Sequence, residues 1–352
     1  MALFDETCAA IVSVDRQAAA DTQRLLDQKT KPRRSLGRLE DLACTIAAMT
    51  GRSPPAPLCK AIVLMAGDHG VAREGVSAYP PEVTRQMLLN FAHGGAAINV
   101  LARHVGARLL VFNMGVCGPD QPIPGVQSRR VKPGTDNFTK GPAMDRESAI
   151  VALEHGIGIA AELAAAGVNL IGIGEMGIGN STAATALLAA FTGESPQTIT
   201  GYGTGIDDAT RARKVAIIEK ALQVNRAHEL GALARLAALG GFEIAGLAGV
   251  VLGAAAHRVP IVLDGFIAST AAMCAVGLAE NAAQYLIASH RSVEVGHRLV
   301  LRRLGCEPLF DLGMRLGEGT GAALAMPMIE AAVRLVHEMA TFSQAQVADT
   351  GR

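Results

Sequence analysis

Short apolar runs alternate along the chain with longer segments of helical periodicity. The runs predict strands at positions 61–66, 109–114, 169–174, 260–264, 284–288 and 308–312. Short, almost continuously hydrophobic strands separated by helices are typical of a parallel sheet that is covered on both faces. The pattern therefore predicts an α/β fold, a doubly wound and mostly parallel sheet of about six strands flanked by helices.

Helical periodicity fills most of the segments between these strands. Apolar stripes at helical spacing predict helices at 81–91, 96–104, 145–166, 182–191, 207–226, 268–280 and 293–304. The least regular segment, 115–140, is rich in proline and is expected to be a long surface excursion near a site.

The two ends of the chain carry helical patterns without strands, at 15–27, 36–49 and 328–342. Ser35 is the expected N-cap of the second helix, and Pro327 lies near the start of the last. These helices predict a small helical domain built from residues 1–55 with 328–352. Residues 56–327 are then the α/β domain.

Composition narrows the possible partners. The formal net charge is zero and the pI is about 7.1, so no basic surface indicates nucleic acid. The apolar segment 236–256 is long enough to suggest a membrane span, but it carries Glu243 and five glycines. We interpret it as a buried helix and expect neither a nucleic-acid nor a membrane partner.

The cysteines indicate the compartment. None of the six belongs to a C-x-x-C pair or shows zinc-ligand spacing. The first residues also lack the basic and long apolar regions of a signal peptide. A cytoplasmic protein with reduced thiols is therefore expected.

Two acidic residues lie in glycine-rich segments that look like anion-binding turns. Glu175 lies in Gly172-Ile-Gly-Glu-Met-Gly-Ile-Gly-Asn180, and Glu318 lies in Leu316-Gly-Glu-Gly-Thr-Gly321. Each segment follows a short apolar run and precedes an alanine-rich helix, a geometry that directs backbone N–H groups at an anion. Because a carboxylate repels phosphate, the two acids predict chemistry on a phosphorylated substrate, with the carboxyl groups facing a cationic or protic group.

Other polar residues follow the remaining strands. Asp68 and His69 come after the first strand, Asp264 after the fourth, and Ser289 to Ser292 after the fifth. Any one of them alone is more often an ordinary loop residue. Since open α/β sheets bind ligands at the carboxyl ends of their strands, several such turns together predict a pocket at that edge.

A dinucleotide site is the first alternative. Gly172, Gly174 and Gly177 fit the G-x-G-x-x-G signature, but a second strand ending in an acid about twenty residues on is missing. Glu194 has the distance without the strand. A nicotinamide-dinucleotide-dependent oxidoreductase therefore remains an alternative.

Several motifs in order carry a resemblance to a known family. They are Lys31-Pro-Arg-Arg-Ser-Leu-Gly-Arg-Leu-Glu40, Ala66-Gly-Asp-His-Gly-Val71, Glu74-Gly-Val-Ser-Ala-Tyr-Pro80, Gly174-Glu-Met-Gly-Ile-Gly-Asn180 and Leu316-Gly-Glu-Gly-Thr-Gly321. The chain resembles the nicotinate-nucleotide:dimethylbenzimidazole phosphoribosyltransferases. The family usually has glycine where Arg34 stands and threonine where Ser181 stands.

The resemblance implies a reaction. Such enzymes transfer the phosphoribosyl group of nicotinate mononucleotide to 5,6-dimethylbenzimidazole, giving α-ribazole 5′-phosphate and nicotinate for the lower ligand of cobalamin. It also implies a homodimer. In that chemistry Glu318 is the general base that takes the acceptor's proton, and Glu175 stabilises positive charge on the ribose or orients its hydroxyls.

The resemblance also assigns binding residues. The phosphate is expected on the N–H groups of Gly177, Ile178, Gly179 and Asn180 and the hydroxyl of Ser181. Lys214 and Ser292 join them by family likeness, and Asp264 is counted with the nucleotide-binding residues. The flat base is expected against Tyr79, Gln86, Met87 and Leu316, although Met87 alone would read as helix core.

Neither a metal nor a cofactor is expected. Asp68, His69 and Glu74 are the nearest approach to a ligand cluster, but they match no metal spacing. A second alternative is a non-catalytic nucleotide-sensing module, which would keep the phosphate turn but would not need a carboxylate at Glu318.

Overall fold

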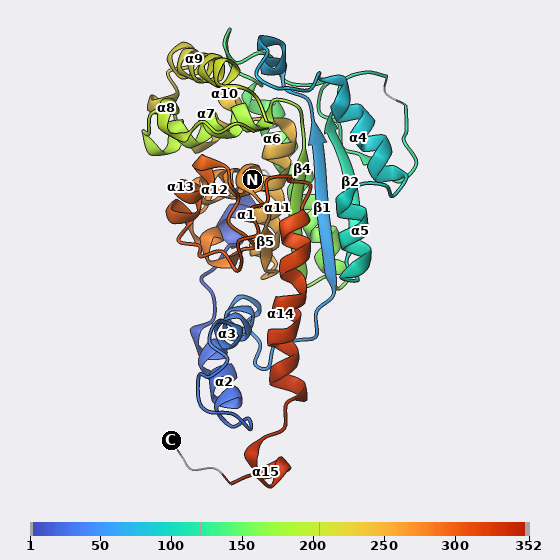
Figure 1. Ribbon diagram of the computed structural model, residues 1–352, viewed down its shortest axis with the longest axis vertical. Helices are drawn as coiled ribbons and strands as arrows, with labels where there is room; N and C mark the ends of the chain where they lie inside the picture. Colours follow the sequence, from blue (N-terminus) through green and yellow to red (C-terminus); the bar gives the residue numbers. More distant parts are fainter. Residues whose placement is uncertain (1–2, 120, 204, 349–352) are drawn as a thin grey trace.

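A six-stranded, entirely parallel sheet forms the centre of the computed structural model, which describes residues 3–119, 121–203 and 205–348 (Figure 1). The strands lie in the order β3-β2-β1-β4-β5-β6. Their bounds are β1 Lys60–Gly67, β2 Arg108–Gly115, β3 Val126–Ser128, β4 Leu170–Met176, β5 Ile261–Leu263 and β6 Leu286–Ala288. The expected α/β class and strand number are confirmed.

The strand order creates a switch point between β1 and β4. From β1 the chain proceeds to β2 and β3 on one side, whereas β4, β5 and β6 follow on the other. Strand β1 is buried along almost its whole length, which its continuous apolar sequence predicts. Ligands of open α/β sheets bind where the strand order reverses, so the carboxyl ends of β1 and β4 mark the expected site.

Helices cover both faces of the sheet. Helix α11 packs on β1, β2 and β4 and along α6 and α12, whereas α14 packs on β1, β4 and β5 and against α5. Figure 1 shows α14 in front of the sheet and α6 and α11 behind it. The main helices are α4 Glu82–Ala92, α5 Ala97–His104, α6 Arg146–Ala165, α7 Asn180–Thr192, α9 Asp208–Val224, α10 Ala232–Leu239, α11 Phe242–Ala256, α12 Phe266–Leu278, α13 Val295–Leu304 and α14 Thr320–Glu338.

Helices from the two ends of the chain lie together beyond the sheet. Helices α2 (Arg16–Asp27) and α3 (Arg38–Thr50) pack on each other and on α14 (Figure 1). The remaining short elements are α1 Leu3–Ala10, α8 Pro196–Ile199, α15 Phe342–Ala345, η1 Gly70–Glu74, η2 Ala227–Glu229 and η3 Glu280–Tyr285. The expected domain division stays a prediction, and its residues 1–2 and 349–352 lie outside the described residues.

Some element predictions were wrong. Segment 308–312 is not a strand, because only Phe310 bridges to His290. The short edge strand β3 was missed. Gly37, not Ser35, is the N-cap of α3. Helix α14 starts at Thr320, so Pro327 lies inside it.

The apolar segment 236–256 forms the end of α10 and all of α11, and the α11 side chains are buried, as expected. One described helix, α6, is long and apolar enough to cross a membrane, but half of that apolar window is buried inside the protein. Gly156 of α6 lies directly against the backbone of Gly246 in α11. Helix α6 is therefore a core helix that packs closely on its neighbour.

Candidate active site

The carboxyl edge of the sheet gathers the acids that the sequence singled out. Asp68 follows β1, and Asp264 follows β5. Glu175 is the penultimate residue of β4 rather than part of the turn after it, and it pairs in register with Met65. The Glu318 turn follows no strand, yet it reaches the same edge.

Close backbone approach brings the two acidic segments together. A side chain at Gly174 would collide with the backbone of Glu318 and Gly319, and one at Gly317 would collide with the Glu175 carboxylate. Glycine is required at Gly174 because the Glu318 turn lies directly on the end of β4, and glycine is favoured at Gly317 also by its φ of +86°. The two acids predicted separately from sequence therefore belong to one site.

Glu175 is held in a low-polarity environment. Its side chain is 7% exposed, and the Asn180 side-chain amide donates a hydrogen bond to Oε2. Burial, and next the nearby charge of Asp264, raise the pKa of Glu175 to about 8. A carboxyl group with such a pKa is typical of a functional site.

Glu318, in the second glycine-rich segment, is buried. It is 6% exposed and has an Oε2 atom that is buried without a hydrogen-bond partner among the described residues. Burial raises its pKa to about 7, although the nearby Ile98 N–H acts to lower its pKa. A carboxyl group with a pKa near neutrality is suited to accept a proton at physiological pH.

The glycine-rich turn after β4 leads into α7. Gly179 has φ +95° and is the N-cap of the helix. The Ile178 N–H donates to the Thr84 hydroxyl at 3.1 Å, and the Asn180 N–H donates to the Gly177 carbonyl at 3.1 Å. Two of the four amides predicted to hold the phosphate are thus engaged within the protein, and Thr84 had no signal in the sequence.

Lys214 supports this turn from α9. Its Nζ donates to the Ser181 hydroxyl at 2.9 Å, and its side chain is fully buried. Burial lowers the pKa of Lys214 to about 8. Lys214, which only the family resemblance assigned to the phosphate site, therefore contacts the Ser181 hydroxyl that is expected to bind the phosphate.

A cavity of about 320 Å³ opens at this edge of the sheet. It is lined by Ser77, Tyr79, Glu175, Met176, Gly177, Ile178, Gly179, Asn180, Ser181, Gly203, Ile267, Glu294, Arg315 and Leu316. Tyr79 and Leu316 are each more than half exposed, as a wall for a flat ligand requires. Gln86 is exposed and Met87 half-buried on α4, so their contact with a base stays a prediction.

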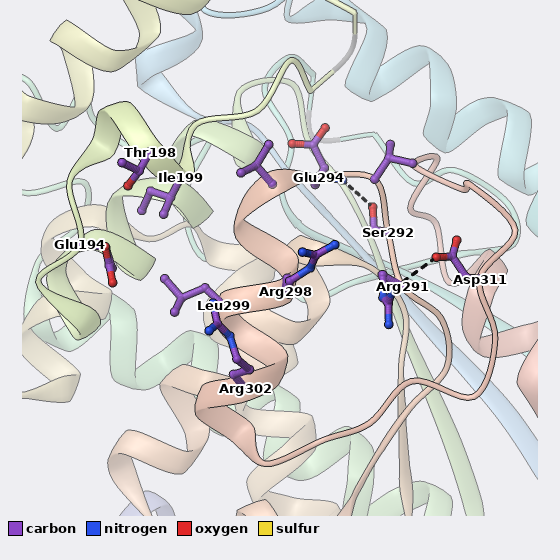
Figure 2. Close-up of a pocket in the computed structure, with 12 residues that line it drawn as sticks. Glu194, Thr198, Ile199, Arg291, Ser292, Glu294, Arg298, Leu299, Arg302 and Asp311 are labelled. Atoms are coloured by element: carbon purple, nitrogen blue, oxygen red, sulfur yellow. Dashed lines mark hydrogen bonds and ion pairs between the residues drawn. The ribbon is translucent and has the colours of Figure 1, made fainter.

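A neighbouring cavity of about 570 Å³ lies on the other side of Glu294, which lines both cavities. Figure 2 shows Arg298 and Arg302 of α13 facing it, with Glu194 across the opening. Ser292 lines this larger cavity, and its N–H donates to the buried His297 Nδ1 at 3.0 Å. Glu175 lines the smaller cavity, and the segment that carries Glu318 contributes Leu316 to its wall, so this cavity is the candidate active site.

Buried polar contacts support the same edge from below. His69 Nε2 lies 2.6 Å from Glu243 Oε1, and the side chains of both are fully buried. Asp68 accepts a hydrogen bond from the Cys117 N–H at 2.7 Å. Because a side chain at Gly177 would lie within 3.3 Å of the Glu243 carboxylate, this pair sits directly beneath the glycine-rich turn.

Asp264 contacts the start of α14 instead of lying where the expected nucleotide contact would require it. It is 1% exposed, and its two carboxylate oxygens accept the N–H groups of Gly319 and Gly321 at 2.9 and 2.7 Å. Its carboxylate therefore faces the start of α14, which leaves its contact with a nucleotide a prediction that this geometry does not favour.

Comparison with known proteins fits this geometry. A phosphoribosyltransferase family model matches residues 11–347. The chain belongs to that phosphoribosyltransferase family. It is 53% identical over 347 residues to the nicotinate-nucleotide–dimethylbenzimidazole phosphoribosyltransferase of Geobacter metallireducens, covering 99% of this chain and 98% of that protein.

Other relatives agree. The Roseiflexus sp. protein of the same name is 54% identical, covering 99% of this chain and 98% of its own length. Among solved structures, CobT from Thermus thermophilus superposes with a TM-score of 0.90 at 45% identity, covering 94% of this chain and 99% of that one. The resemblance deduced from the motifs is confirmed.

Proposed function

We propose that this phosphoribosyltransferase moves the phosphoribosyl group of nicotinate mononucleotide to 5,6-dimethylbenzimidazole. The products are α-ribazole 5′-phosphate and nicotinate, and the reaction belongs to synthesis of the cobalamin lower ligand. The observation that carries the proposal is the meeting of Glu175 and Glu318, with pKa values raised to about 8 and 7, beside a glycine-rich turn. The activity for which these relatives are named supports the two substrates.

The acceptor end of the reaction needs a base. The benzimidazole attacks the anomeric carbon through one nitrogen and must lose the proton on the other. Glu318 takes that proton, and its raised pKa matches the task. Its carboxyl group must turn towards the cavity, because Glu318 does not line the cavity in this structure.

The donor end develops positive charge. Nicotinate leaves with the bonding electrons, which neutralises its ring and shifts the charge onto the ribose. Glu175 lines the cavity, and the positive charge of the bound donor favours its ionised form, which stabilises this charge or orients the ribose hydroxyls. The 5′-phosphate is placed at the turn of Gly177 to Ser181, with Lys214 behind the Ser181 hydroxyl.

The base is placed against Tyr79 and Leu316. Both line the cavity and expose apolar surface. Gln86 and Met87 complete this wall if α4 closes on the bound ligand. Ser292 lines the adjacent cavity. Glu294, which lines both cavities, separates it from the phosphate site.

The decisive experiment measures nicotinate release from nicotinate mononucleotide with and without 5,6-dimethylbenzimidazole. Release should depend on the added base, and Glu318→Gln should lower turnover about 100-fold or more while nucleotide binding survives. Release at the same rate without base would indicate hydrolysis instead. Binding without any turnover would favour the sensing module, and hydride transfer the oxidoreductase.

We also propose a cytoplasmic homodimer. Six free thiols suit a reducing compartment. Sedimentation should give about twice the 36.4 kDa mass of the chain.

The packing of α2 and α3 on α14 supports the proposed small helical domain of residues 1–55 with 328–352.

A further inference from the structure

We propose that Asp264 is the positioning residue for Glu318: its carboxylate clamps the start of α14 and thereby holds the catalytic turn in a left-handed backbone conformation. The inference rests on the proposed role of Glu318 as the base. It gives Asp264 a task in place of the nucleotide contact expected from sequence.

The turn that carries Glu318 is strained. Gly317, Glu318 and Gly319 have φ values of +86°, +63° and +87°, so three successive residues are left-handed. Glycine adopts this region at little cost, whereas a residue with a side chain loses about 1 kcal/mol or more. Such strain persists only where the surrounding structure fixes the conformation.

Asp264 supplies that fixing contact from a different part of the chain. Its Oδ2 accepts the Gly319 N–H at 2.9 Å, and its Oδ1 accepts the Gly321 N–H at 2.7 Å. These are among the first N–H groups of α14, which have no partner within the helix. Gly319, the N-cap, has no side chain to cap them itself.

The clamp is close-packed. A side chain at Gly321 would collide with the His290 ring and lie 2.8 Å from Asp264 Oδ1. His290 Nδ1 lies 4.0 Å from the same oxygen and 3.0 Å from the Ser289 hydroxyl. Asp264 therefore cannot move aside without disturbing β5, β6 and α14 together.

Asp264 also acts on Glu318 through its charge. It is among the groups that raise the pKa of Glu318, after burial, and of Glu175. The titratable groups that face the Glu318 turn are thus Asp264, Glu175 and, behind Asp264, His290, whose pKa is lowered by burial. The Asp264 carboxylate therefore orients Glu318 and also helps to keep the pKa of Glu318 near neutrality.

The test is Asp264→Asn, which keeps the shape but turns an amide NH₂ towards one of the two N–H groups. Turnover should fall about 10- to 100-fold, because a small displacement of a catalytic group costs a factor of that size. KM for both substrates should stay within about 3-fold, since Asp264 does not contact the cavity. Asp15→Asn, which alters the cap of α2, is the matched control and should keep full turnover.

A double-mutant cycle separates positioning from general damage. In a Glu318→Gln background, Asp264→Asn should change the residual rate by less than about 3-fold, because the base it positions is already gone. An equal fall in both backgrounds would overturn the proposal. A raised KM for the nucleotide with unchanged kcat would overturn it too and restore the nucleotide contact.

Two further observations keep the outcome clear. If the unaltered protein shows no transfer, the proposed function fails; if it transfers and Asp264→Asn keeps kcat, only the positioning role fails. If Asp264→Asn does not fold, hydrogen exchange at Gly319 and Gly321 in the unaltered protein decides. Exchange as slow as in the interior of α14 supports the clamp, and exchange at the rate of an open loop contradicts it.

Discussion

Glu318 combines two features that cost stability. Its backbone is left-handed at φ +63°, and its Oε2 is buried without a partner among the described residues. A glycine would remove both costs but would also remove the base. The residue is therefore a site where function is retained at the expense of stability.

We expect Glu318→Gly to raise the free energy of unfolding by about 1 kcal/mol, the usual cost of a left-handed non-glycine residue. Turnover should fall about 100-fold or more because no base remains. Urea unfolding and steady-state rates measure the two effects. A variant less stable than the parent would contradict the strain argument.

Arg34 provides the control. It also has a left-handed backbone, at φ +59°. Its ion pair with Asp41 is exposed and contributes little. Arg34→Gly should therefore give a similar gain in stability while turnover is kept, which would separate backbone strain from catalysis.

The raised pKa of Glu318 also predicts how the rate depends on pH. A general base acts in its deprotonated form, so with a pKa of about 7 in the free enzyme the log of kcat/KM should rise with pH below 7 and level off above it. The residual activity of Glu318→Gln should not show this rise with pH. A rate that falls as pH rises through 7 would contradict a base and indicate a general acid.

At the scale of elements, close helix packing depends on single glycines. Gly156 of α6 faces the backbone of Gly246 and Val250 in α11, and a side chain there has no room. Gly158, two residues along the same helix, has nothing near the position of a side chain. The two positions therefore form a matched pair.

Gly156→Ala should lower the free energy of unfolding by about 2 kcal/mol or more, because it overpacks the contact of the two helices. Gly158→Ala should raise it by about 0.5–1 kcal/mol, because alanine favours a helix over glycine. Urea unfolding of both variants checks the prediction. Equal effects of the two substitutions would show that α6 can move away from α11.

The same scale shows what the sequence could predict. Strands β1, β2 and β4 were predictable because buried parallel strands are continuously apolar. The edge strand β3 is short and mostly exposed and carries no such signal. The apolar run at 308–312 failed as a strand because pairing depends on a neighbour, and only Phe310 finds one.

Site residues divide along the same line. Glu175 and Glu318 were predictable because their glycine-rich surroundings are local in sequence. Thr84 and the Asp264 clamp were not, because each acts on a residue at least 55 positions away. Contacts of that kind arise only once the fold has brought the strand ends together.

For the whole molecule, the switch point between β1 and β4 determines where chemistry occurs. The chain to β2 and β3 departs on one side and the chain to β5 and β6 on the other, which leaves the end of β4 open. Glu175 is the penultimate residue of that strand, and the Glu318 turn lies directly on it. The position of the site thus follows from topology, and its chemistry from two acids.

The last prediction concerns metal ions. Phosphoribosyltransferases that expel pyrophosphate commonly use Mg²⁺ to offset a leaving group of several negative charges. Here the proposed leaving group begins as a pyridinium and departs carrying only its carboxylate, so a divalent cation has little transition-state charge to neutralise. Turnover of the transferase should therefore survive thorough chelation.

Dialysis against EDTA followed by the nicotinate-release assay provides the measurement. The rate should stay within about 2-fold of the untreated enzyme, and added Mg²⁺ or Zn²⁺ should not increase it. A pyrophosphate-expelling phosphoribosyltransferase treated in parallel should lose its activity and regain it with Mg²⁺. If this enzyme did the same, both the metal-free transfer and a donor with a single phosphate would be contradicted.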